Sequence, residues 1–208
     1  MRAPPLAALA FVVVAGCASA PIVVSLAEPS PPPTAKDYVD ELKKWTRSGH
    51  LLADFDEALT VNATFRSPEF RAAYAQKWIV TYRIGPDDAA RTRERLMSEG
   101  ADTWEFHVES SAHRWEINDF SSKKSIWRLA LVDDTGREVT AKETVATTNR
   151  RELEMEFYPY ANIFSKGWTL RFPKTLTDGT ALIGPDTRTV TLRIAGPMGV
   201  IDLVWTLK

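Results

Sequence analysis

The chain has little of several features that would place it in a class at once. It carries one cysteine in 208 residues, Cys17, which excludes an intrachain disulfide. Its apolar run at residues 6–15 spans ten residues, about half of the roughly 20 that a membrane-spanning helix needs. The 26 basic and 27 acidic residues give a net charge of −1. Without a positive field, nucleic acid is not expected as a partner.

Catalytic sequence motifs are also lacking. The chain has no G-x-S-x-G nucleophile motif, no P-loop and no G-x-G-x-x-G dinucleotide-binding motif. There are three histidines, His50, His107 and His113, so few general bases are available. We therefore expect a protein without enzymatic activity and without a cofactor.

What is present begins with residues 6–17, LAALAFVVVAGC, behind the positive charge of Arg2. A short apolar run after a basic residue is typical of the h-region of an export signal. Its exit, Val14-Ala15-Gly16-Cys17, resembles the lipobox of bacterial lipoproteins. The resemblance covers the first 17 residues only. It implies cleavage before Cys17, diacylation of the Cys17 sulfur and usually acylation of the new N-terminus, with palmitate as a typical chain. Several acyl chains are enough for stable anchoring in a membrane.

The residue after the cysteine carries sorting information in the same family. Asp at this position implies retention in the inner membrane of many Gram-negative bacteria, whereas this chain has Ala18. The resemblance therefore implies a lipid anchor in the outer membrane and a body that faces the periplasm. An alternative remains, because Ala18-Ser19-Ala20 has the A-x-A form of an ordinary secretory cleavage site. Cleavage after Ala20 would release a soluble periplasmic or secreted protein.

The composition divides the chain into three parts. Residues 1–16 are the expected signal peptide, residues 17–35 an acylated cysteine with a proline-rich tether, and residues 36–208 one globular domain. Five prolines between positions 21 and 33 disfavour a helix or a central strand and favour an extended chain. At about 3.1 Å per residue, such a tether would reach up to about 55 Å.

Residues 36–100 are predicted to be mostly helical. Tyr38, Leu42 and Trp45 recur at helical spacing, and Gly49 is expected to end this first helix. A strand is predicted at residues 59–65. Ser67-Pro68 then has the form of an N-cap followed by an N1 proline. A third, polar helix is predicted from Pro86 to about Ser98.

Residues 101–208 are predicted to be mostly strand, because their apolar residues alternate with polar ones. Strands are expected near residues 103–109, 115–117, 126–132, 139–140, 153–157, 168–172, 190–194 and 201–207. Strands that are apolar on one face only must bury that face against another layer. We therefore expect an α+β fold leaning to all-β: an antiparallel, immunoglobulin-like β-sandwich with two or three helices from the N-terminal half packed against it.

One cluster of chemically competent side chains stands out. Glu105, His107 and Glu109 project from the same face of a predicted strand, with neighbours about 6.8 Å apart. Together with His113 they are candidate ligands of a divalent metal ion. The alternative is a solvated strand face that carries no chemistry, and this is the interpretation favoured here. Tyr158 and Tyr160, on either side of Pro159, are candidate exposed loop aromatics for binding a partner.

These observations favour a membrane-anchored lipoprotein that acts as a non-catalytic accessory or interaction module of the envelope, with another envelope protein as its partner. One alternative is a metal-binding protein or metal-dependent enzyme that uses Glu105, His107, Glu109 and His113. Another is a carrier of a lipid or small molecule, for which a cavity above about 300 Å³ would be needed.

Overall fold

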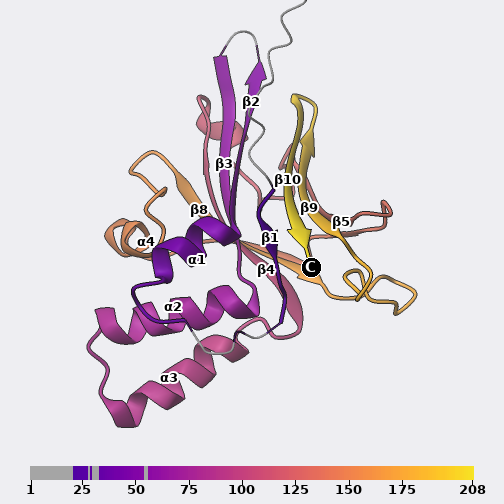
Figure 1. Ribbon diagram of the computed structural model, residues 1–208. Coiled ribbons are helices and arrows are strands. Elements are labelled where there is room, and N and C mark those ends of the chain that lie inside the picture. Colours follow the sequence, from indigo (N-terminus) through magenta and orange to yellow (C-terminus); the bar gives the residue numbers. More distant parts are fainter. Residues whose placement is uncertain (1–20, 28, 30–32, 54–55) are drawn as a thin grey trace, which may run out of the picture.

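A computed structural model describes residues 21–27, 29, 33–53 and 56–208 of the chain. The fold is α+β, with four α-helices and two five-stranded sheets in this described part. The predicted signal peptide, Cys17 and the alternative cleavage site after Ala20 lie outside it. In Figure 1 the helices lie on the outer side of one sheet, and β10, β9 and β5 of the other sheet lie on its opposite side.

The first sheet is antiparallel except at one edge, where β1 runs parallel to β10. In spatial order it contains β1 (Val23–Val24), β10 (Gly199–Leu207), β9 (Thr189–Gly196), β5 (Arg128–Asp133) and β6 (Glu138–Thr140).

The second sheet is antiparallel throughout. In spatial order it contains β2 (Thr46–Ala53), β3 (Asp56–Phe65), β4 (Thr103–Ser111), β8 (Lys166–Pro173) and β7 (Glu143–Ala146).

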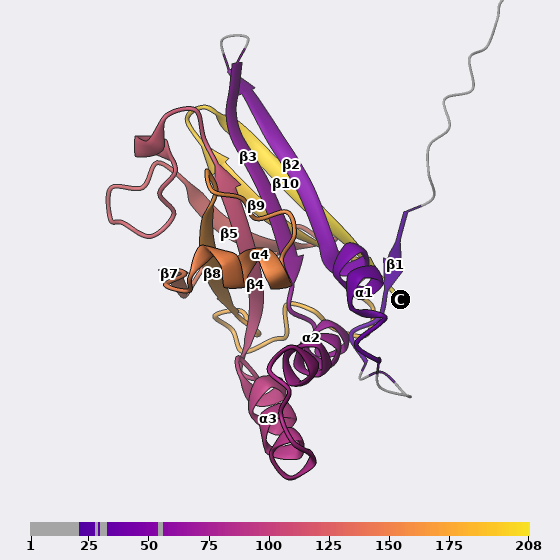
Figure 2. The same ribbon diagram turned by 90° about the vertical axis from the view of Figure 1, so that its left-hand side faces the viewer.

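The helices lie on the side of the second sheet that faces away from the first (Figures 1 and 2). They are α1 (Tyr38–Trp45), α2 (Pro68–Thr81), α3 (Pro86–Ser98) and α4 (Arg151–Phe157), with a short 3-10 turn η1 (Trp115–Ile117) after β4. The Ser67 N-cap prediction is confirmed, since the Ser67 hydroxyl accepts a hydrogen bond from the Phe70 amide at 3.1 Å. None of the described helices is both long and apolar enough to cross a membrane.

Aromatic side chains fill the space between the two sheets. Phe65 of β3 stacks on Phe106 of β4 with ring centroids 4.6 Å apart, and the ring of Trp205 from the other sheet lies 5.3 Å from Phe106. The indole Nε1 of Trp205 donates to the carbonyl oxygen of Trp45 at 2.9 Å. These side chains are fully buried.

The first helix is shorter than predicted, because it ends at Trp45 and β2 follows directly. Thr46 is extended, and its hydroxyl donates to the carbonyl oxygen of Leu42 at 2.6 Å, which terminates the helix. Gly49 lies within β2 rather than at a helix end. A Cβ atom at this position would stand 2.6 Å from Cγ2 of Ile201, so glycine allows the two sheets to approach each other here.

The predicted strand at residues 153–157 is wrong, since these residues form α4. Arg, Glu, Leu and Met are strong helix formers. Leu153 and Phe157 stand at i and i+4, a spacing that fits one face of a helix as well as alternate positions of a strand. Phe157 and Glu154 are buried against the body, whereas Met155 is exposed.

Two further segments differ from expectation. Val23 and Val24, which the sequence places in the tether, form β1 and pair with Thr206 and Leu207 of β10. Trp115 and Ile117, which the alternation places in a strand, belong to η1. Trp115 is the exception among the tryptophans, because 81% of its surface is exposed.

Candidate functional site

Glu105, His107 and Glu109 do project from one face of β4, but this face is buried and not solvated. Their exposed fractions are 1%, 5% and 1%. β4 is a central strand between β3 and β8, and its other face contributes Phe106 and Val108 to the aromatic core. Figure 2 shows α4 in front of β4 and β8, on the side that the charged residues face. The interpretation of a solvated strand face is therefore wrong.

Three guanidinium groups surround Glu105. Nη1 of Arg66 and Nη2 of Arg71 lie 2.7 Å and 3.3 Å from its Oε1. Nε of Arg171 lies 2.8 Å from Oε2. Burial alone would raise the pKa of Glu105, but the charges of Arg66 and Arg71 and the hydrogen bond from Arg171 lower this pKa below its ordinary value. The carboxylate is therefore ionised, and both of its oxygens are already paired.

Glu109 is held in a similar way two positions beyond His107. Nη1 of Arg151 lies 3.0 Å from its Oε2, and the hydroxyl of Ser165 donates to the same oxygen. Nε2 of His107 lies 3.3 Å from Oε1. Burial would raise the pKa of Glu109, but the contacts with His107, Ser165 and Arg151 lower it. For His107 burial is the larger effect, and it lowers the pKa of the imidazole.

Tyr158 and Tyr160 are not the exposed loop aromatics that the sequence suggests. Tyr158 is buried and stacks on the His107 ring, with centroids 3.6 Å apart and planes 12° apart. Burial raises the pKa of its phenol to about 12. Tyr160 is half-buried, and its hydroxyl shares a hydrogen bond of 2.6 Å with the hydroxyl of Thr64. Tyr158 therefore packs over β4, and Tyr160 is only partly exposed.

We refer to Glu105, His107, Glu109 and the arginines paired with them as the β4 charge layer. Each carboxylate oxygen of Glu105 and Glu109 already has a cationic partner in this layer. His113 lies beyond the end of β4 and is exposed, so the structure does not bring it to His107. In the described part of the chain, no group of three His, Cys, Asp or Glu residues is arranged to hold a metal ion.

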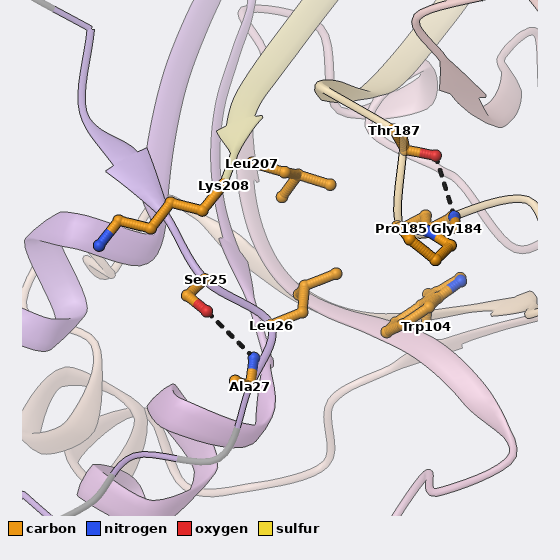
Figure 3. A pocket seen from close by; sticks show the side chains of 10 residues that line it. Ser25, Leu26, Ala27, Trp104, Gly184, Pro185, Thr187, Leu207 and Lys208 are labelled. Atoms are coloured by element: carbon orange, nitrogen blue, oxygen red, sulfur yellow. Dashed lines mark hydrogen bonds between the residues drawn. The ribbon is translucent and has the colours of Figure 1, made fainter.

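A pocket of about 410 Å³ opens at the end of the body where β4 begins and β10 ends. In Figure 3 the side chains of Leu26, Leu207 and Pro185 and the indole ring of Trp104 converge around one space. The lining is mainly apolar, and its volume lies in the range typical of small-molecule sites. Its residues come from four separate segments of the chain, so no local sequence signal could have identified them.

Exposed aromatic side chains gather on the loops at the opposite end of β4. Trp115 on η1 and Phe164 in the loop before β8 are each 81% exposed. Their loops leave the paired ends of β4 and β8, where Ser110 stands opposite Lys166. The sequence contains these residues but does not reveal their exposure, because an apolar side chain in a loop is as often part of a core.

No protein family model matches the sequence, and none of the curated proteins matches it. A solved structure, described as a novel protein of unknown function from Burkholderia pseudomallei, is similar to the chain with 11% identity and a TM-score of 0.37. The match covers 80% of each chain. A likeness at this level carries no argument about function.

Proposed function

We propose that the chain is a lipoprotein of the bacterial envelope, anchored in the outer membrane through acylated Cys17, with a periplasmic body that binds a partner and catalyses no reaction. The anchor is supported by the lipobox and by the absence of any other cysteine. We also propose that the two packed five-stranded sheets belong to the immunoglobulin-like type of β-sandwich, which is supported by their mainly antiparallel pairing.

The observation that carries the non-catalytic assignment is the β4 charge layer. General acid–base catalysis needs a side chain within hydrogen-bond reach of the substrate. The strongest candidates in this chain, Glu105, His107 and Glu109, are buried; the two carboxylates are paired with arginines, and His107 is stacked on Tyr158. Such a layer supports the structure of the sheet and the position of the helices above it.

A binding role is supported by the loops. Loops on a rigid sheet scaffold are common binding surfaces, and tryptophan is enriched among the residues that dominate interface energies. Trp115 and Phe164 replace Tyr158 and Tyr160 as the proposed partner contacts, because they are exposed and the tyrosines are not.

The anchor is tested by expressing the full chain and its Cys17→Ser variant in a Gram-negative host fed radiolabelled palmitate. We expect the wild type to incorporate label and to enter the detergent phase in a Triton X-114 separation, and the variant to lose both properties. A wild-type mature protein that begins at Pro21 and stays in the aqueous phase would contradict the proposal and support secretory cleavage after Ala20.

The partner is sought by crosslinking the acylated protein in its own envelope and capturing it. Recovery of a specific envelope protein, lost in a variant with both Trp115 and Phe164 replaced by serine, would support the binding role. Recovery of lipid alone would count against it.

A carrier of a small apolar molecule is the second candidate function. The pocket beside Trp104 favours it, because its volume of about 410 Å³ exceeds the roughly 300 Å³ at which small-molecule sites begin. It lies at the end of the sheets and not between them.

A further inference from the structure

The folded body begins close to the proposed lipid anchor. Val24 is fully buried, and its carbonyl oxygen accepts a hydrogen bond from the Lys208 amide at 2.9 Å. The preceding residue, Val23, pairs with Thr206 of β10. The carbonyl oxygen of Ile22 accepts a hydrogen bond from Nη2 of Arg47 at 3.5 Å. The chain is therefore attached to the folded body from Ile22 onward.

This attachment limits the reach of the anchor. Ile22 follows Cys17 by five positions, and a fully extended chain spans at most about 3.6 Å per residue. The backbone of an acylated Cys17 would therefore lie within about 18 Å of Ile22. The spacer of up to about 55 Å that the prolines suggest is not available, because β1 lies between Cys17 and the four prolines at positions 29 and 31–33.

A distinct surface lies beside this point of attachment. We define the β10 face by the outward-facing side chains of Val23, Val200 and Val204, all of which are exposed. Alternate residues of β10 face outward, and Val23 faces the same side because it pairs with the outward-facing Thr206. Asp202 and Thr206 of β10 also face outward, and the Asp202 carboxylate is paired with Arg193 of β9 at 2.7 Å, so the face consists of exposed valines around one ion pair.

A positive charge lies beside the β10 face. Nε of Arg47 donates to the carbonyl oxygen of Val204 at 2.8 Å, its other hydrogen bonds also go to carbonyl oxygens, and its guanidinium lies 5.6 Å from the centre of the Trp205 ring. Among the described residues, no carboxylate forms an ion pair with Arg47. Apolar side chains beside an uncompensated cation suit the boundary between the acyl chains and the anionic headgroups of a phospholipid surface.

We propose that the β10 face rests on the surface of the membrane that holds the Cys17 lipid. The inference depends on the proposed acylation and specifies how the body is oriented. The occupant is a phospholipid surface, because a short connection to an embedded acyl chain keeps β1 and the adjoining β10 face close to the bilayer. In Figure 2 β1 lies at one side of the body, and β7 lies at the other.

The experiment uses the full acylated chain with a single added thiol. Val204→Cys places the thiol on the β10 face, and Val145→Cys on β7 is its matched control. Both valines are on strands and have nearly equal exposed fractions, 44% and 43%. Because acylated Cys17 carries no reactive thiol, a polarity-sensitive fluorophore labels only the added cysteine. The labelled proteins are reconstituted in phosphatidylethanolamine–phosphatidylglycerol vesicles that contain a headgroup nitroxide lipid.

We expect the nitroxide lipid to quench the probe at position 204 several-fold more than the probe at position 145. A second variant inserts 20 Gly/Ser residues between Ala20 and Pro21, which adds about 25 Å of flexible reach. This insertion should leave the protein on the vesicles and remove most of the difference in quenching between positions 204 and 145.

Equal quenching at both positions on protein that floats with the vesicles would overturn the orientation and leave the anchor standing. If the difference in quenching persisted in full after the insertion, the short connection between Cys17 and Ile22 would not be what orients the body, and the proposal would be overturned. Shielding of position 204 from a soluble quencher without quenching by lipid would assign the face to a second copy of the chain, and would also overturn the proposal. Failure to float, with Cys17 itself labelled, would refute the proposed anchor and the orientation with it.

Discussion

Two glutamates that share one arginine provide a direct test of the β4 charge layer. Arg171 donates from Nε to Glu105 at 2.8 Å and from Nη1 to Glu143 at 2.7 Å. The distances are nearly equal, but the side chain of Glu105 is fully buried and that of Glu143 is 50% exposed. We therefore predict very different effects for Glu105→Gln and Glu143→Gln, although each substitution removes one carboxylate from the same guanidinium.

The expected magnitudes follow from what each substitution leaves behind. Glu105→Gln leaves Arg66 and Arg71 as buried charges without their carboxylate, and removing one partner of a buried pair typically costs about 3–5 kcal/mol. Glu143→Gln disrupts a solvent-exposed pair, which is worth about 0–1 kcal/mol. With an m-value of about 2 kcal/mol per molar urea, the first change lowers the unfolding midpoint by about 2 M, and the second lowers it by less than about 0.5 M.

The assay is urea unfolding of the purified protein at pH 7, followed by tryptophan fluorescence. Because the pKa of Glu105 is lower in the folded state than its ordinary value of 4.5, its contribution is fully present above that value and is lost as the pH falls through the folded pKa. The difference in the free energy of unfolding between the wild type and Glu105→Gln should therefore become smaller at acidic pH. Equal losses for the two variants at pH 7 would refute the reasoning that burial sets the strength of these pairs.

Two further predictions concern His107 and the pocket. Because burial lowers the pKa of His107 below its ordinary value of 6.5, the unfolded chain takes up a proton that the folded protein excludes, and stability falls as the pH drops below about 6.5. We expect this loss of stability to develop as the pH is lowered from 7 to 5.5. In urea titrations, His107→Gln should remove that part of the dependence of stability on pH. If His107→Gln and His113→Gln showed the same dependence of stability on pH, the prediction would be contradicted. Trp104→Ala should weaken binding of the apolar dye anilinonaphthalene sulfonate about tenfold, or about 1.4 kcal/mol, whereas Trp115→Ala should not. Equal binding by both variants would assign the dye to another surface.

Local signals in the sequence predict the elements that local chemistry determines. The Ser67-Pro68 cap, the polar helix α3 and the alternating strands β4, β8 and β10 occur where the pattern places them. The pattern fails in α4, because three apolar residues at every second position over seven residues also include an i, i+4 pair. A segment this short does not distinguish a strand from a helix by periodicity alone.

The candidate site depended on contacts that no local pattern contains. The polar face of β4 has the sequence of a solvated strand, and it becomes a buried layer because helices and Tyr158 pack over it. The arginines that neutralise Glu105 come from positions 66, 71 and 171. β1 was missed for a similar reason, because two valines among prolines gain their strand partner from the far end of the chain. The sequence predicts which side chains share a face, but not what covers that face.

The pairing of β1 with β10 has a consequence for the order of folding. The second sheet draws all its strands from residues 46–173, whereas the first sheet needs β9 and β10 from the last part of the chain. Trp205 must also arrive before the aromatic core closes, and its bond to the Trp45 carbonyl spans 160 residues. Contacts this distant in sequence slow folding. The aromatic core therefore cannot be completed before β10 is available.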